Sequence, residues 1–137
     1  MDGRERQNAE DNRISDKPPL TRDIARARHF YDAALRPLGY TCLSADEGSL
    51  GYGAKSPEYW INRTDHPVPT DDRSGLHSCF TAPDRDAVDA FYKAALQAGG
   101  KDNGKPGLRA EYGPNYYAAF VVDPDGYRIE AWCGKKS

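Results

Sequence analysis

The chain has 137 residues, of which 38% are hydrophobic and 29% charged, and its formal net charge at pH 7 is -2. This composition is enough for one compact domain with a core, and it gives no electrostatic reason to expect nucleic acid or an anionic membrane as a partner. Three cysteines without a C-x-x-C pair, and no apolar stretch of the length of a signal or membrane span, favour a cytoplasmic protein that acts on a small molecule.

The first 20 residues are polar, with almost no apolar side chains among them. Such a segment cannot bury enough surface to offset the entropy of ordering. We therefore expect a flexible tail over residues 1–20, followed by a single domain over residues 21–137.

The first element after the tail is predicted to be a helix. Apolar residues recur at helical spacing from Ile24 to Leu38, Thr21 or Asp23 can cap the start, and Gly39 ends the run. Three short segments of strand character follow, separated by turn formers, at residues 40–45, 49–54 and 58–63. They indicate an antiparallel meander.

Residues 64–75 are rich in turn formers and poor in apolar residues. They are predicted to connect a first module, residues 21–63, to a second module, residues 76–133. The second module is expected to contain, in order, a strand (76–82), a helix from Pro83-Asp84 to Gly99-Gly100, a Gly- and Pro-rich loop (103–114) and a hairpin of strands 116–122 and 127–132.

The two modules carry a repeated sequence. The segment DIARARHFYDAAL at residues 23–35 recurs as DRDAVDAFYKAAL at residues 84–96, and Gly39 is answered by Gly100 at the same offset of 61 residues. Two similar modules must bury their apolar faces against each other, so a pseudo-twofold cavity between them is the default binding site.

Four segments carry a family resemblance. They are the helix motif at residues 29–40, the strand LHSCF at 76–80, the loop GKPGLR at 104–109 and the ending AFVVDPDGYRIEA at 119–131. Together they resemble the glyoxalase/bleomycin-resistance/extradiol-dioxygenase group, the vicinal oxygen chelate superfamily, over roughly Thr21 to Cys133. The resemblance implies an α+β fold of two βαβββ modules forming a curved mixed sheet around a cleft that holds a divalent metal ion. Members range from isomerases, lyases and dioxygenases to drug-sequestering proteins without chemistry, so the fold does not fix the reaction.

His77 and Glu130 are the candidate metal ligands. Alternation along their strands puts both on the face opposite the apolar residues, which is the concave side if the apolar sets pack beneath the helices. An imidazole and a carboxylate suit Zn, Fe, Mn, Ni or Co and leave positions open for substrate oxygens. The resemblance assigns the same two residues to metal ligation and permits Glu130 to be the catalytic base. The alternative is a hydrogen-bonded strand histidine and a solvated glutamate.

The first module departs from the family pattern at both of its ligand positions. The residue 61 positions before His77 is Asp16, where members with three ligands usually place a histidine. Asp16 could ligate a hard metal ion, but the prolines that follow it do not suit a strand, so the first strand of this module is expected to be lost or altered. The residue aligned with Glu130 is Trp60, which cannot bind a metal. The chain thus retains two clear ligands.

Further residues are expected to shape the site. A cation and phenolic donors for an anionic or carbonyl-bearing substrate lie in or just after the Gly/Pro loop: Arg109, Tyr112, Tyr116 and Tyr117. Trp60 and Trp132 could hold an aromatic or cationic compound. The alternative for each is an ordinary exposed or half-buried side chain.

Three functions stay open at this point. The first is a glyoxalase-like, metal-dependent small-molecule enzyme of lyase, isomerase or dioxygenase type. The second is a sequestering protein of the bleomycin-resistance type, and the third is a degenerate, inactive member. The sheet edge left by the altered strand would also invite pairing of two chains into a homodimer.

Overall fold

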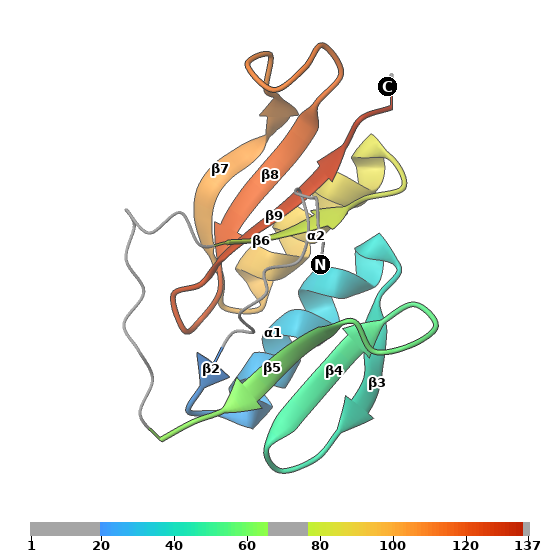
Figure 1. The fold of residues 1–137 in the computed structure, drawn as a ribbon. Coiled ribbons are helices and arrows are strands. Elements are labelled where there is room, and N and C mark those ends of the chain that lie inside the picture. The colour runs from blue at the N-terminus through green and yellow to red at the C-terminus, as the bar shows by residue number, and fades with distance from the viewer. Residues whose placement is uncertain (1–19, 66–76, 136–137) are drawn as a thin grey trace, which may run out of the picture.

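The computed structural model describes residues 20–65 and 77–135 (Figure 1). The first module consists of β2 (Leu20–Thr21), α1 (Ile24–Leu35), the 3-10 turn η1 (Arg36–Leu38), β3 (Thr41–Ala45), β4 (Ser49–Gly53) and β5 (Tyr59–Arg63). The second module consists of β6 (His77–Thr81), α2 (Arg85–Gln97), β7 (Lys101–Leu108), β8 (Tyr117–Val122) and β9 (Arg128–Cys133).

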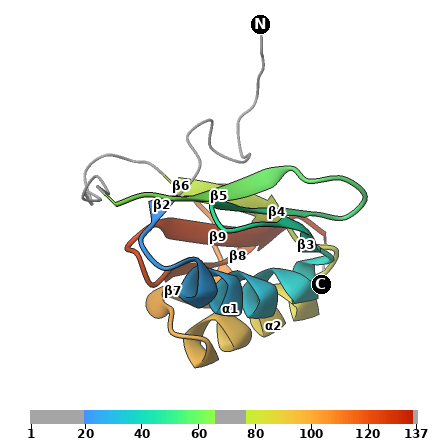
Figure 2. The ribbon, with the colours of Figure 1, turned by 90° about the horizontal axis from the view of Figure 1, so that it is seen from below.

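Each module forms one four-stranded sheet, in the order β2-β5-β4-β3 in the first and β6-β9-β8-β7 in the second. In both sheets the first strand pairs in parallel with the last, and the other pairs are antiparallel. The predicted α+β fold of two modules with mixed sheets is therefore confirmed. Both helices lie on the same side of the sheets, as Figure 2 shows from below. We call the opposite side of the sheets the helix-distal face.

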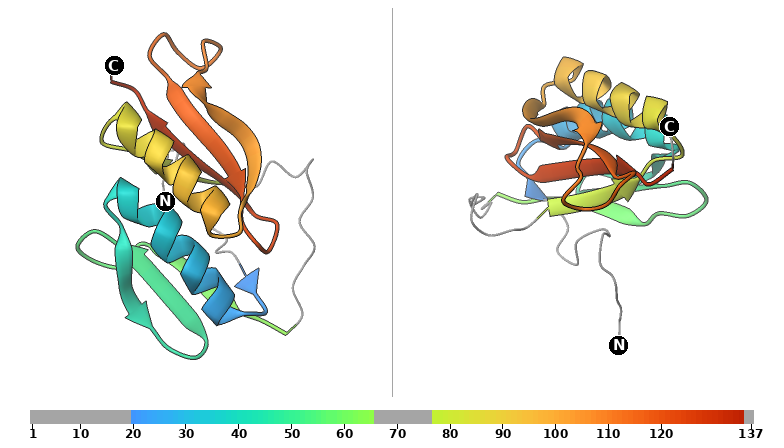
Figure 3. Two further views of the ribbon diagram at one scale, coloured as in Figure 1. Left: turned by 180° about the vertical axis from the view of Figure 1, so that it is seen from behind. Right: turned by 90° about the horizontal axis from the view of Figure 1, so that it is seen from above.

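The two helices begin in the same way, at positions related by the repeat. The carboxylate of Asp23 accepts the backbone N–H of Arg26 at 3.0 Å, and that of Asp84 accepts the N–H of Ala87 at 2.8 Å. Each cap satisfies one of the backbone donors that a helix leaves free at its start. The helices lie side by side against the sheets (Figure 3). Neither has the length and apolar character needed to cross a membrane.

The first strand of module one is short in the part of the chain that the structure describes. Leu20 and Thr21 pair with Asn62 and Arg63 of β5. Strand β2 therefore includes Leu20, the last residue of the tail expected over residues 1–20. Asp16 and most of the expected connector lie outside the described residues.

The expected loop over residues 103–114 is wrong in its first half, because β7 extends to Leu108. Its pairing with β8 shifts register on both sides of Gly104. Such bulges, together with a proline, are tolerated at a sheet edge, where β7 lies. Glycine and proline therefore belong to an irregular edge strand here. The loop between β7 and β8 is limited to residues 109–116.

The two modules share one core. The ring of Phe80 in β6 packs edge-to-face on Tyr59 of β5, with centroids 4.9 Å apart, and on Tyr40, at 5.5 Å. The largest fully buried apolar residues of both modules belong to this cluster: Phe30, Leu35, Leu50, Ile61, Val88, Phe91, Val121 and Ile129. The pairing of the modules therefore buries their apolar faces, as the repeat predicts.

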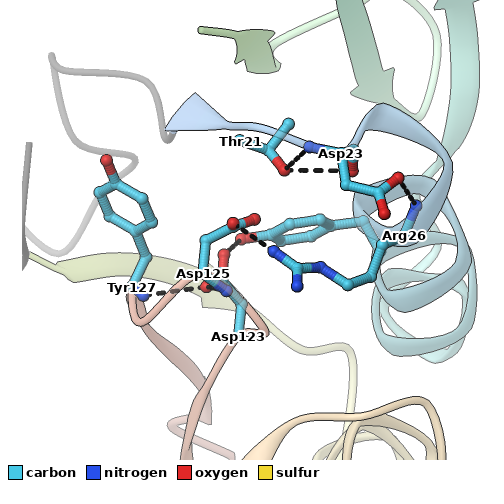
Figure 4. A network of polar contacts seen from close by, with 7 residues as sticks. Thr21, Asp23, Arg26, Asp123, Asp125 and Tyr127 are labelled. Carbon is cyan, nitrogen blue, oxygen red and sulfur yellow. Dashed lines mark hydrogen bonds and ion pairs between the residues drawn. The ribbon is translucent and has the colours of Figure 1, made fainter. Parts of the chain in front are cut away.

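A buried polar network also joins the modules. The phenol of Tyr31 in α1 donates to the carboxylate of Asp123, which precedes the β8–β9 turn, and Asp123 also accepts the backbone N–H groups of Asp125 and Tyr127 (Figure 4). Burial raises the pKa of Asp123 to about 6, and these hydrogen bonds oppose the rise. At the surface of the same turn, Arg26 forms an ion pair with Asp125 at 2.6 Å.

Candidate functional site

The strands of the second module divide their side chains between the core and the helix-distal face. In β9, Ile129 and Ala131 belong to the core cluster, whereas Glu130 does not. In β6 the core residue is Phe80, and its neighbour Cys79 lies outside the cluster. Because successive strand residues point to opposite faces, Glu130 and Cys79 project to the helix-distal face. Glu130 is nevertheless only 5% exposed.

A row of four residues crosses this face of the sheet. Cys79 pairs in register with Glu130, Glu130 with Phe120, and Phe120 with Gly104. Residues directly opposite each other in neighbouring strands share a face, with Cβ atoms about 4.5–5.5 Å apart in antiparallel pairs. Glu130 therefore has a thiol on one side and an aromatic ring on the other.

The carboxylate of Glu130 accepts a hydrogen bond from the phenol of Tyr116. The Tyr116 ring stacks on Trp132, with centroids 4.8 Å apart and planes 5° apart. The ring of Tyr112, which is 63% exposed, lies 5.2 Å from that of Tyr116. Three neighbouring aromatic rings therefore lie beside Glu130: Tyr116 and Trp132 are stacked, and the exposed Tyr112 is tilted against Tyr116.

Burial and Glu130 keep the neighbouring donors protonated. Burial, with the hydrogen bond to Glu130 second, raises the pKa of the Tyr116 phenol well above its usual range. Burial, and then the charge of Glu130, likewise raises the pKa of the Cys79 thiol. Since the thiolate is the reactive form of cysteine, Cys79 is a neutral neighbour of Glu130 and not a nucleophile in this state.

Arg109 lies beside this row. Its guanidinium carbon is 5.3 Å from the centre of the Phe120 ring, and its Nη2 donates to the backbone oxygen of Lys105 at 2.5 Å. Within residues 20–65 and 77–135 no carboxylate is within ion-pair distance of it. The cation is therefore held in place without its charge being neutralised.

The structure places Tyr117 on the other side of the sheet. Its hydroxyl donates to Asp89 of α2 at 2.6 Å, and the guanidinium of Arg85 lies over its ring at 5.2 Å. The arrangement that surrounds Glu130 therefore does not include Tyr117. Tyr116, which is also among the expected substrate contacts, belongs to that arrangement.

Strand register shows what stands at the position of Glu130 in the first module. Leu20 pairs with Asn62, and the repeat equivalent of Leu20, Thr81, pairs with Trp132. Asn62 therefore corresponds to Trp132, and two residues earlier Trp60 corresponds to Glu130. The indole of Trp60 lies over Gly51, where a Cβ would come within 2.8 Å of the ring.

Trp60 and the row around Glu130 face the same side of the molecule. On the core side, Ser78 Oγ of β6 donates to the hydroxyl of Tyr59 of β5 at 3.2 Å. The next residues along these strands, Cys79 and Trp60, therefore both point to the helix-distal face. Trp60 is 37% exposed there.

Of the expected metal ligands, the structure describes only the side chain of Glu130. His77 is the first residue of β6, where its backbone pairs with Arg128, but its side chain lies outside the described part, as does the whole of Asp16. Among the described side chains no group of three or more His, Cys, Asp and Glu could hold a metal ion. A buried carboxylate facing away from the core does suit a divalent cation, because buried charges are paired or bind metals.

Comparison with known proteins points to one family. A family model described as the glyoxalase/bleomycin resistance protein/dioxygenase superfamily matches residues 20–131. No curated protein matches the chain in sequence.

Solved structures share the fold. A glyoxalase/bleomycin resistance protein from Albidiferax ferrireducens T118 is 28% identical, with a TM-score of 0.70 over 84% of this chain and 92% of that one. A glyoxalase/bleomycin resistance protein/dioxygenase family enzyme from Burkholderia phytofirmans PsJN is 16% identical, with a TM-score of 0.65 over 87% and 96%. The V278E mutant of glyoxalase I from Zea mays is 19% identical, with a TM-score of 0.62 over 84% of this chain and 43% of that one.

Proposed function

Because the chain belongs to the glyoxalase/bleomycin resistance protein/dioxygenase superfamily, we propose that it is a metal-dependent enzyme acting on a small molecule at the helix-distal face of its second module. The observation that carries this proposal is the buried carboxylate of Glu130 on that face. A carboxylate held away from both the core and bulk water is suited to bind a cation or to take a proton.

In the proposed site His77 and Glu130 hold the divalent metal, with Asp16 as a third ligand. Strand alternation supports this pairing, since position 77 precedes Cys79 by two residues and therefore shares the face of Glu130. Zn, Fe, Mn, Ni or Co, when bound, would polarise a substrate oxygen. Glu130 would serve as ligand and proton acceptor, as in a lyase, isomerase or dioxygenase of this family.

The neighbouring residues would position the substrate. The phenol of Tyr116 holds the Glu130 carboxylate in one orientation, and the stack on Trp132 in turn fixes the Tyr116 ring. Arg109 offers a positive charge at the far side of Phe120. Tyr112 and Trp60 are the exposed aromatic residues at the edges of this arrangement.

Metal binding tests the proposal directly. Protein stripped with a chelator and titrated calorimetrically with Zn²⁺, Co²⁺, Ni²⁺ and Mn²⁺ should bind one ion per chain. His77→Ala and Glu130→Gln should abolish binding, and Asp16→Asn should weaken it. Glu58→Gln, at an exposed glutamate near Trp60, is the matched control and should bind normally. Failure of the wild type to bind any of these ions, or unchanged binding by His77→Ala, would refute the metal-dependent enzyme.

A second function is favoured by Trp60. The indole of Trp60 stands at the first-module position equivalent to Glu130, and the rings of Tyr112, Tyr116 and Trp132 lie close together in the second module. The helix-distal face is therefore rich in aromatic side chains. This suits a protein that sequesters an aromatic or cationic compound without chemistry. Quenching of tryptophan fluorescence by such compounds in metal-free protein, lost in Trp60→Leu, would support sequestration. The absence of both metal binding and quenching would indicate a degenerate member.

We also propose a cytoplasmic homodimer. The three cysteines are free thiols, as expected in a reducing compartment, and β3 and β7 are edge strands of their sheets that a second chain could cover. Light scattering coupled to size-exclusion chromatography should give twice the mass of the chain. A monomer at micromolar concentration would contradict the dimer.

A further inference from the structure

Arg109 carries a positive charge that no carboxylate among the described residues neutralises. A guanidinium has five N–H donors in a rigid plane. One Nη2 donor is used by the backbone oxygen of Lys105, and the guanidinium carbon lies over the Phe120 ring, 5.3 Å from its centre. No ion pair takes up its charge among the residues that the structure describes. This differs from Arg26, whose charge is paired with Asp125.

Gly104 provides the space in which the guanidinium lies. A Cβ at this position would come within 2.8 Å of Phe120 Cδ1 and 3.3 Å of Arg109 Nη2. Its φ of +147° is also one that residues with a side chain rarely adopt. Both the backbone conformation and the missing side chain of Gly104 therefore leave room for the Arg109 guanidinium beside Phe120.

This cation lies next to the row that contains Glu130. Phe120, on which the guanidinium rests, is the direct neighbour of Glu130 in the sheet. The backbone N–H of Arg109 also donates to the oxygen of Tyr116 at 2.7 Å, so the cation and the first ring of the stack are joined at the base of one loop. A ligand bound to Arg109 would therefore extend over Phe120 toward Glu130 and Tyr116.

The aromatic stack offers a second contact of a different kind. The ring of Tyr112, which is 63% exposed, lies 5.2 Å from that of Tyr116 and is accessible to a ligand. The stacked rings of Tyr116 and Trp132 present a planar apolar surface beside it.

From these contacts we propose that the ligand of this face is a small organic anion with a planar group. Its carboxylate or phosphonate oxygens bind the guanidinium of Arg109, and its planar group lies toward Tyr116 and Trp132. The fork of a guanidinium matches two oxygens of such an anion, which a lysine cannot do. The proposal rests on the proposed function only in taking the helix-distal face as the ligand site.

The test uses benzoate and phenylphosphonate as anionic probes, with benzyl alcohol as the neutral and benzylamine as the cationic counterpart. Binding to the full chain is followed by ligand-observed NMR in the presence of a chelator, so that no metal contributes. The two anions should bind to the wild type more tightly than the other probes. Arg109→Gln should weaken anion binding by about 10-fold, which is the loss expected for a charge-assisted hydrogen bond. Arg109→Lys should give an intermediate affinity.

Arg85→Gln is the matched control. It also removes a guanidinium that lies over an aromatic ring, that of Tyr117, but on the helix side of the sheet. It should leave anion binding unchanged, and circular dichroism should show all variants folded. Equal binding of benzyl alcohol and benzoate, or wild-type affinity in Arg109→Gln, would overturn the proposal.

This outcome is separate from that of the metal titration. Anion binding that depends on Arg109 in a chain that binds no metal would uphold the inference and refute the metal-dependent enzyme. Metal binding through His77 and Glu130 without any preference for anions would uphold the metal-dependent enzyme and refute the inference of an anionic ligand.

Discussion

Trp60 occupies in the first module the register position that Glu130 occupies in the second. The two residues face the same side of the paired sheets, yet one is a half-exposed indole and the other a buried carboxylate. The duplicated halves have therefore diverged at this position. In the proposed metal site, β5 of the first module contributes no carboxylate at the position equivalent to Glu130.

Restoring a carboxylate at position 60 should strengthen metal binding. Trp60→Glu adds a second charged oxygen ligand at the position equivalent to Glu130, and affinity for hard divalent ions rises with the number of such ligands. Competition with a fluorescent chelator should show at least about 10-fold tighter binding of Mn²⁺ or Co²⁺ than in the wild type. The control is Trp60→Gln, because glutamine has the size of glutamate but carries no charge. Equal affinities of the Glu and Gln variants would mean that position 60 does not face the metal.

The sequence was sufficient for the features that depend on repetition and alternation. The offset of 61 residues located both helices, and alternation put Glu130 on the face away from the core, as the structure shows. Comparison of the closing strands of the two modules aligned Trp60 with Glu130, and strand register confirms that alignment. These are local or periodic properties, which a single sequence records directly.

Contacts between segments that are distant in the chain could not be predicted from the sequence. The Tyr31–Asp123 hydrogen bond joins residues 92 positions apart, and the Tyr116 phenol reaches Glu130 only because of how the loop folds. The edge strand β7 was mistaken in part for a loop, because Gly104 and Pro106 are typical of both. The role of His77 as a metal ligand stays a prediction.

Removing the phenol of Tyr116 should destabilise the fold through Glu130. Tyr116→Phe keeps the ring that stacks on Trp132 but removes the donor to a buried carboxylate. A hydrogen bond to a charged group contributes about 1.5–3 kcal/mol, so urea unfolding should show a loss of about that size. Tyr112→Phe removes the hydroxyl of the exposed ring next to Tyr116 and should change the free energy of unfolding by less than about 0.5 kcal/mol. Similar losses in both variants would show that the Glu130 contact is unimportant.

Stability should rise as the pH falls from 7 to 5 because of Asp123. Its pKa in the folded state is about 6, above the value of about 3.9 expected for an unfolded chain, so the folded state binds the proton more tightly. The gain is about 1 kcal/mol between pH 7 and 5 and reaches about 3 kcal/mol below pH 4. Urea unfolding at pH 7 and pH 5 gives the change in the free energy of unfolding with pH, for the wild type and for Asp123→Asn. The difference between these two pH slopes is the contribution of Asp123. Asp65→Asn, at an exposed carboxylate that pairs with Arg63 and takes no part in this network, should keep the wild-type slope. An equal slope in Asp123→Asn would assign the effect to other groups.

Gly39 and Gly100, although equivalent in the repeat, should respond differently to substitution. Gly39 has a φ of +91° and no atom within 4 Å of an added Cβ, so it is needed for its backbone conformation. An added Cβ at Gly100 would lie 2.6 Å from Phe30 Cε1, so this glycine is needed for space between the modules.

Gly39→Ala should therefore cost about 1–2 kcal/mol, and Gly39→Asn less, because asparagine tolerates the left-handed region. Gly100→Ala should cost about 1–3 kcal/mol through overpacking, and Gly100→Asn more, because the larger side chain must also fit against Phe30. Urea unfolding of the four variants separates the two causes, since asparagine is the milder change at position 39 and the harsher one at position 100. The same order of alanine and asparagine at both positions would mean that a single cause acts at both glycines.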